Sequence, residues 1–65
     1  MPNKRLKQMR NEKGFTQIKL ARVSGVPIRN IRAYENGSVN INQAAAETVL
    51  KLATALDCTV EDLIE

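Results

Sequence analysis

The sequence predicts an all-α fold, a compact bundle of five helices that occupies residues 1–65 as a single domain. Two observations support this prediction. Apolar residues recur three and four positions apart in separate segments, which is the spacing of one helix face. Glycine, proline and capping residues lie between these segments, where helices end and begin. A chain this short buries only about 60% of its unfolded surface and depends on tight helix packing.

The first helix is expected over residues 4–13. Pro2 and Asn3 offer a stop and a cap before it, and Gly14 is its C-terminal glycine. Its inward face is expected to carry Leu6, Met9 and Arg10.

The second helix is expected over residues 17–23, with Thr16 as its N-cap. Phe15 can pack on Leu20 as a hydrophobic staple, so we expect Phe15 in the core and not as a ring that stacks on bases. Four apolar side chains fit one stripe of this helix: Ile18, Leu20, Ala21 and Val23.

A tight turn joins this helix to a third, expected over residues 27–35, and the pair forms a helix-turn-helix. Gly25 can take the positive φ that ends one helix and starts a sharp turn. Pro27 suits the first turn of the third helix because proline lacks a backbone N–H. Val26 then points inward, and the third helix buries Ile31 and Tyr34.

Asn36 and Gly37 end the third helix, and residues 38–42 are expected to form a polar loop. An amphipathic fourth helix is expected over residues 43–57. Its buried positions follow the helical period: Ala45, Val49, Leu52, Ala53 and Leu56. Thr59 is expected to cap a short fifth helix over residues 60–64, whose Leu63 and Ile64 return to the core.

Charge divides the chain into two halves. Residues 1–34 contain nine of the ten basic residues and one acid, whereas residues 35–65 contain six of the seven acids and one base. A basic half that contains the helix-turn-helix indicates a surface that neutralises nucleic-acid phosphates.

The composition excludes several other classes. No apolar run approaches the roughly 18 residues of a membrane span, so we expect a cytoplasmic protein without membrane contact. The single Cys58 and the lack of histidine leave too few ligands for a metal site, and we expect no cofactor. No group of residues resembles a catalytic site, so an enzyme is not expected.

The central motif resembles the phage repressor/Cro-type (XRE-type) helix-turn-helix family, which has a lambda-repressor-like fold. The matching positions are Gln17, Leu20, Ala21, Gly25, Val26, Ile31 and Tyr34. The resemblance extends to KGFTQ at 13–17, YENG at 34–37 and LKLATALDCTVEDLIE at 50–65. It implies a sequence-specific regulator of transcription, whose third helix enters the major groove of double-stranded DNA.

The candidate base-reading residues lie on the face of the third helix opposite Ile31 and Tyr34. They are Ile28, Arg29, Asn30, Arg32 and Ala33. Arg29 is the first choice, since a guanidinium can donate two hydrogen bonds to guanine O6 and N7. Ile28 and Ala33 offer apolar surface to a thymine methyl group, while Arg32 and Asn30 suit either bases or phosphates.

Candidate phosphate contacts follow from the helix ends and from the resemblance. The start of the second helix presents unpaired N–H groups beside Thr16 and Gln17, and Gln17 is expected at the surface. The resemblance implies that Gln17 also bridges to the third helix. The resemblance implies phosphate contacts at Asn36 and Gly37, and an ion pair of Arg10 with Glu35 that gives Arg10 both a structural and a phosphate role. The loop after Gly37 lacks Lys and Arg, unlike that of the best-known members, which leaves Gln43 as a weaker minor-groove contact.

The resemblance also implies a repressor that binds a palindromic operator as a homodimer. The expected dimer interface is the apolar part of the C-terminal segment: Leu56, Val60, Leu63 and Ile64. The alternative is an antitoxin-like interaction module, in which the acidic half binds a partner protein and the chain also binds DNA. Salt-dependent binding to random duplex favours the first reading, and co-purification of a second chain favours the alternative.

Overall fold

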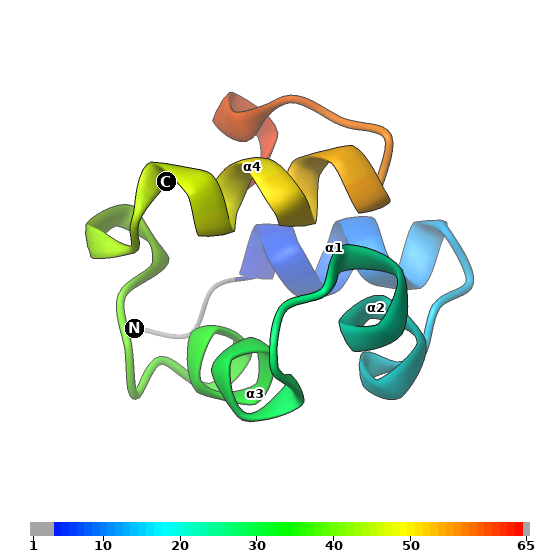
Figure 1. Ribbon diagram of the computed structural model, residues 1–65, viewed down its shortest axis with the longest axis horizontal. Coiled ribbons are helices and arrows are strands. Elements are labelled where there is room, and N and C mark those ends of the chain that lie inside the picture. Colours follow the sequence, from blue (N-terminus) through cyan, green and yellow to red (C-terminus); the bar gives the residue numbers. More distant parts are fainter. Residues whose placement is uncertain (1–3, 65) are drawn as a thin grey trace.

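The computed structural model describes residues 4–64 of the chain (Figure 1). Its α-helices are α1 (Lys4–Glu12), α2 (Gln17–Ser24), α3 (Ile28–Asn36) and α4 (Ala46–Ala55). Two short 3₁₀ turns, η1 (Ile41–Gln43) and η2 (Val60–Asp62), lie before and after α4. Every regular element of the described part is helical, which confirms the all-α prediction. Pro2 and Asn3, predicted to stop and cap the first helix, lie outside the described residues.

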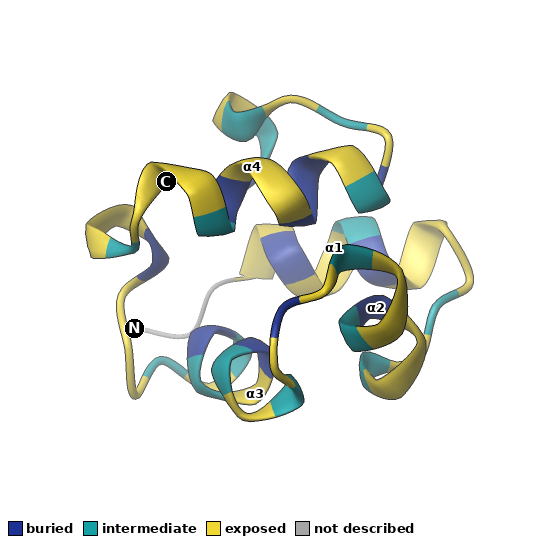
Figure 2. Cartoon of the chain, viewed as in Figure 1, coloured by how far each residue is buried: buried dark blue, intermediate teal, exposed yellow. Residues whose placement is uncertain are grey.

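The helices pack around one core within extents of 23 × 20 × 19 Å. Helix α2 contacts both α3 and α4, α1 contacts α3, and η2 packs on α4. Figure 2 shows the buried residues on the inward sides of the helices, and exposed and intermediate residues on the outward sides of α2 and α3. The fully buried side chains come from elements throughout the chain: Leu6, Leu20, Ile31, Leu52 and Leu63. No described helix is long and apolar enough to cross a bilayer.

The local signals around α2 behave as predicted. The Thr16 hydroxyl oxygen accepts a hydrogen bond from the Lys19 amide at 3.0 Å, which caps the helix. Gly25 ends α2 with φ 75° and donates its N–H to the Ala21 carbonyl. Phe15 packs against the core, as the staple requires.

The prediction of five α-helices is wrong, because the last element is a three-residue 3₁₀ turn. The Thr59 hydroxyl accepts from the Asp62 amide at 3.3 Å, and the Asp62 carboxylate accepts from the Thr59 amide at 3.0 Å. This capping box holds η2, but Leu63 donates back to Val60 and closes the turn after three residues.

The fourth helix is also shorter than predicted. Its start moves to Ala46 because Ala44 and Ala45 adopt extended backbone conformations, with ψ values of 156° and 139°. Its end moves to Ala55 because Asp57 takes a left-handed conformation with φ 54°. The segment predicted as a polar loop instead contains η1, which buries Ile41 to 2% exposure.

Burial corrects the assignments of several apolar side chains, among them Ala45 and Ile64, which were expected in the core but are exposed. Ile18 and Val23 were expected in the core stripe of α2 but are 55% and 49% exposed. Leu56 and Leu63 were expected both in the core and at a dimer interface; with exposures of 5% and 0% they lie in the core, and neither offers surface to a second copy. Because η2 packs against α4, both leucines are buried in the core of a single copy. Of the residues predicted for the dimer interface, only Ile64 and the half-buried Val60 remain at the surface of the molecule.

Candidate nucleic-acid interface

Helix α3 has one buried face and one exposed face. Ile31 and Tyr34 anchor it, with exposures of 0% and 6%, and burial raises the pKa of the Tyr34 phenol. Arg29 and Arg32 lie exposed on the other side. The remaining predicted base readers are partly exposed: Ile28, Asn30 and Ala33. The predicted residues therefore share one outward surface of the helix.

The turn between α2 and α3 fixes where this surface begins. The Val26 amide donates to the Ser24 hydroxyl oxygen at 3.1 Å, and the Val26 side chain is 3% exposed. Pro27 precedes the first residue of α3 instead of occupying its first turn, and its carbonyl accepts from the amides of Asn30 and Ile31. The first residue of the helix, Ile28, is thus held by an apolar anchor and a rigid proline.

A buried polar network joins the first three helices. The Arg10 Nε donates to Glu35 Oε2 at 2.7 Å, and Arg10 Nη2 donates to Glu35 Oε1 at 3.0 Å. The third nitrogen, Nη1, donates to the Phe15 carbonyl at 2.8 Å. The Gln17 side chain donates to Glu35 Oε1 at 3.1 Å. We call these four residues the polar clamp.

The polar clamp confirms the ion pair between Arg10 and Glu35 and changes the roles of its members. The Arg10 side chain is only 10% exposed, and its Nε, Nη1 and Nη2 each donate a hydrogen bond within the protein, so Arg10 has the structural role that the ion pair implied. Gln17, expected at the surface, is half-buried and bound to Glu35. This bond to Glu35, 18 residues along the chain, is a bridge to α3 of the kind that the family resemblance implied.

The two ends predicted to meet phosphate are held by this clamp. Gln17 begins α2, and Glu35 lies one residue before the end of α3. At that end the Asn36 side-chain oxygen accepts hydrogen bonds from the Ser38 amide and hydroxyl. Gly37 follows in a left-handed conformation with φ 85°. The start of α2 and the end of α3 are thus tied together within one rigid unit.

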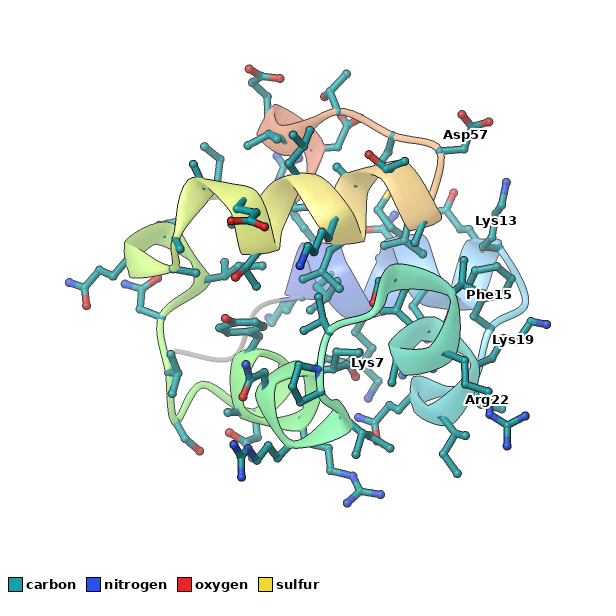
Figure 3. The ribbon with its side chains drawn as sticks, viewed as in Figure 1. Lys7, Lys13, Phe15, Lys19, Arg22 and Asp57 are labelled. Atoms are coloured by element: carbon teal, nitrogen blue, oxygen red, sulfur yellow. The ribbon has the colours of Figure 1, made fainter. Side chains whose placement is uncertain are left out.

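Exposed basic side chains surround this unit. Figure 3 shows Lys13, Lys19 and Arg22 extending outward from the side of α1 and α2, while Asp57 lies past the end of α4. All three basic residues are exposed. The positive charge of the N-terminal half is thus available to a polyanion.

A comparison with protein families identifies the family to which this arrangement of helices belongs. A family model described as helix-turn-helix matches residues 6–63. The chain belongs to the helix-turn-helix family. As an XRE-type member it is a DNA-binding regulator of transcription, as the sequence indicated.

A solved helix-turn-helix structure supports this assignment. The chain is similar to the restriction-modification controller protein C.AhdI from Aeromonas hydrophila, with 35% identity and a TM-score of 0.83. The alignment covers 95% of this chain and 89% of that protein. A comparison with curated proteins found no match.

The C-terminal half of this helix-turn-helix protein holds its one cysteine. Cys58 is half-buried against the core, and burial, together with the carboxylates of Asp62 and Asp57, raises the pKa of its thiol. This environment suppresses the reactive thiolate. Among residues 4–64, no three His, Cys, Asp or Glu side chains gather where they could hold a metal.

Proposed function

We propose that the chain is a repressor that binds a palindromic DNA operator as a homodimer. The observation that carries the proposal is the outward face of α3, where Arg29 and Arg32 stand exposed on a helix anchored by Ile31 and Tyr34. A helix docked in this way can enter the major groove with its outward residues toward base edges.

The proposed contacts divide into base readout and backbone positioning. We assign base readout to the outward set of α3, led by Arg29 for a guanine and by Ile28 and Ala33 for thymine methyl groups. We assign phosphate contacts to Thr16 and Gln17 at the start of α2, and to Asn36 and Gly37 at the end of α3. The Asn36 side-chain oxygen accepts a hydrogen bond from Ser38, which holds the side chain in place. The side-chain NH2 group of Asn36 is the donor that we assign to a phosphate.

The likeness to C.AhdI supports a narrower proposal about the regulated genes. That protein is a restriction-modification controller and shares 35% of its aligned residues with this chain. We infer that this chain controls genes of a restriction-modification system. The operator selected in vitro should then recur in the DNA upstream of such genes.

Selection of bound duplexes from a random pool tests the function. We expect a palindromic consensus with a guanine in each half-site, and an affinity for it about 10³-fold or more above that for scrambled duplex. Binding to scrambled duplex should fall steeply as salt rises, because phosphate contacts release counterions. Enrichment of no sequence, with a stable complex of this chain and another protein instead, would favour the interaction-module reading.

A further inference from the structure

The end of α3 holds a pair of residues whose covalent chemistry the proposed contacts do not use. Asn36 is exposed, and Gly37 follows it with no side chain to shield its backbone nitrogen. A backbone nitrogen that reaches the carbonyl carbon of the preceding asparagine side chain can displace ammonia from it. Asn36 is the only asparagine of the chain that a glycine follows. This pair is therefore the place in the chain where that reaction meets the least steric resistance.

A hydrogen bond from Ser38 brings the two reacting atoms to the same side of the backbone. The Asn36 side-chain oxygen accepts from the Ser38 backbone amide at 2.8 Å. The ring of atoms that this bond closes contains both the Asn36 Cγ and the Gly37 nitrogen. The asparagine side chain is thus folded forward over the peptide bond whose nitrogen is the nucleophile.

Ser38 also favours the charge that the reaction develops. Attack on Cγ turns the side-chain carbonyl oxygen of Asn36 into an oxyanion, and hydrogen-bond donors already aimed at that oxygen stabilise it. Ser38 supplies two such donors, its backbone amide and its hydroxyl. The turn after α3 therefore stabilises the intermediate as well as bringing its atoms together.

We infer that Asn36 is a deamidation site whose reaction ends DNA binding, and the effect on DNA rests on the proposed function. The Gly37 nitrogen loses its proton and bonds to the Asn36 Cγ, the Cγ–Nδ2 bond breaks, and ammonia leaves a cyclic imide. Water then opens the imide at either carbonyl to give aspartate or isoaspartate. Neither step oxidises or reduces the chain, so water is the only reactant added.

The product carries the wrong charge for the proposed contact. The Asn36 NH2 group is the proposed phosphate donor, and the reaction replaces it with a carboxylate, which repels a phosphate. The isoaspartate form also adds a backbone carbon between α3 and Gly37. A bound phosphate engages the NH2 group that must leave, so chains on DNA should react more slowly than free chains. The reaction therefore limits the working life of the free regulator.

Mass spectrometry of the full chain, held without DNA in neutral and in mildly alkaline buffer, tests the reaction. The mass gain of amide-to-acid exchange should localise to Asn36, and its rate should rise with pH because the attacking nitrogen must lose a proton. Asn40 is the matched comparison: its side-chain oxygen likewise accepts from the amide two residues on, at 2.9 Å, but the β-branched Ile41 follows it. Asn40 should remain an amide over the same period. Ser38→Ala should slow the reaction at Asn36 about three- to tenfold, the net worth of one neutral hydrogen bond.

Competition binding on the selected operator tests the consequence. Asn36→Asp reproduces one product and should weaken binding to operator and scrambled duplex alike by about tenfold or more, the worth of a hydrogen bond to a charged group. Asn11→Asp adds the same charge at an exposed asparagine of α1, outside the proposed contacts, and should change binding by less than about twofold because salt screens it. Thermal unfolding of each variant checks that it folds. Saturating operator duplex should slow the reaction at Asn36 of the wild type.

The outcomes separate this inference from the proposed function. Equal rates at Asn36 and Asn40, or no mass gain at Asn36 in alkaline buffer, would overturn the reaction whatever the chain binds. An Asn36→Asp variant that binds the operator as tightly as the wild type would overturn the effect on DNA and leave the proposed function standing. A wild type that selects no duplex would overturn the proposed function and the effect on DNA together, while the mass measurement still decides the reaction.

Discussion

Two ion pairs among the described residues, one from each side of the molecule, differ in burial and in what they join. Arg10 and Glu35 link α1 to the end of α3, with side-chain exposures of 10% and 6%. Lys51 and Glu47 lie within α4, with exposures of 50% and 81%. The first pair fixes elements relative to each other, whereas the second leaves its charges at the surface. The Arg10–Glu35 pair therefore helps to hold in place the exposed face of α3 that we propose reads DNA, whereas both charges of the Lys51–Glu47 pair remain in contact with solvent.

Removal of one carboxylate from each pair tests this difference and should give the largest effect. Glu35→Ala should lower the free energy of unfolding by about 3–5 kcal/mol, because it leaves the Arg10 guanidinium buried without its partner. Glu47→Ala should cost under about 1 kcal/mol, as exposed pairs do. Chemical denaturation measures both. Equal costs would show that the polar clamp does not hold the helices.

Arg29 and Arg22 separate base readout from phosphate contact within the N-terminal half. Arg29→Ala should cost about 1–3 kcal/mol on the selected operator and relax the preference at one base pair in each half-site. Arg22→Ala should weaken operator and scrambled duplex by a similar factor. Competition binding on both duplexes checks this. Equal losses for Arg29→Ala would make that residue a phosphate contact.

Gln17 sharpens the comparison because it belongs both to the polar clamp and to the proposed phosphate site. Gln17→Ala should reduce stability by about 1 kcal/mol, the net worth of one hydrogen bond, and weaken binding to all duplexes alike. Gln8→Ala changes an exposed glutamine on α1 and should do neither. A change in the selected operator sequence would contradict the positioning role.

Asp62 in the acidic half should give the smallest effect, visible only in acid. Hydrogen bonds from Thr59 lower the pKa of Asp62 below its ordinary value of 3.8. A lowered pKa in the folded state means that the carboxylate stabilises the fold fully above pH 3.8. This contribution is lost as the pH falls through the pKa of the folded state. The melting temperature should therefore fall less steeply between neutral and acidic pH for Asp62→Asn than for the wild type. Identical slopes would show that the capping box does not persist in solution.

Local signals in the sequence predicted most of the N-terminal half. The Thr16 cap, the turn at Gly25 and the buried Ile31 each depend on neighbouring residues, so spacing alone reveals them. The C-terminal half was harder, because η1 and η2 depend on how distant segments fold back. Ile41 was expected in a polar loop but is buried by η1, and the sequence left Leu63 both as a core residue and as an interface residue, which the packing of η2 on α4 decides in favour of the core.

The candidate site shows the same limit. The outward set of α3 follows from helical period once Ile31 and Tyr34 are placed inside. The bond between Gln17 and Glu35 does not follow from helical period, because it joins two packed helices; only the family resemblance implied a bridge from Gln17 to the third helix. The exposure of Ile18 and Val23 was likewise not predicted, because helical spacing shows which residues share a face but not which faces pack against another helix.

The central claim is that two copies, held together by their acidic halves, place two basic halves on one face of DNA. Half-sites of such a dimer lie about one helical turn apart, roughly 34 Å. Inserting five base pairs between the selected half-sites turns the second site to the far side of the duplex, about half a turn away. The account predicts that affinity falls toward that for a single half-site. Undiminished affinity for the expanded operator would contradict a rigid two-fold dimer.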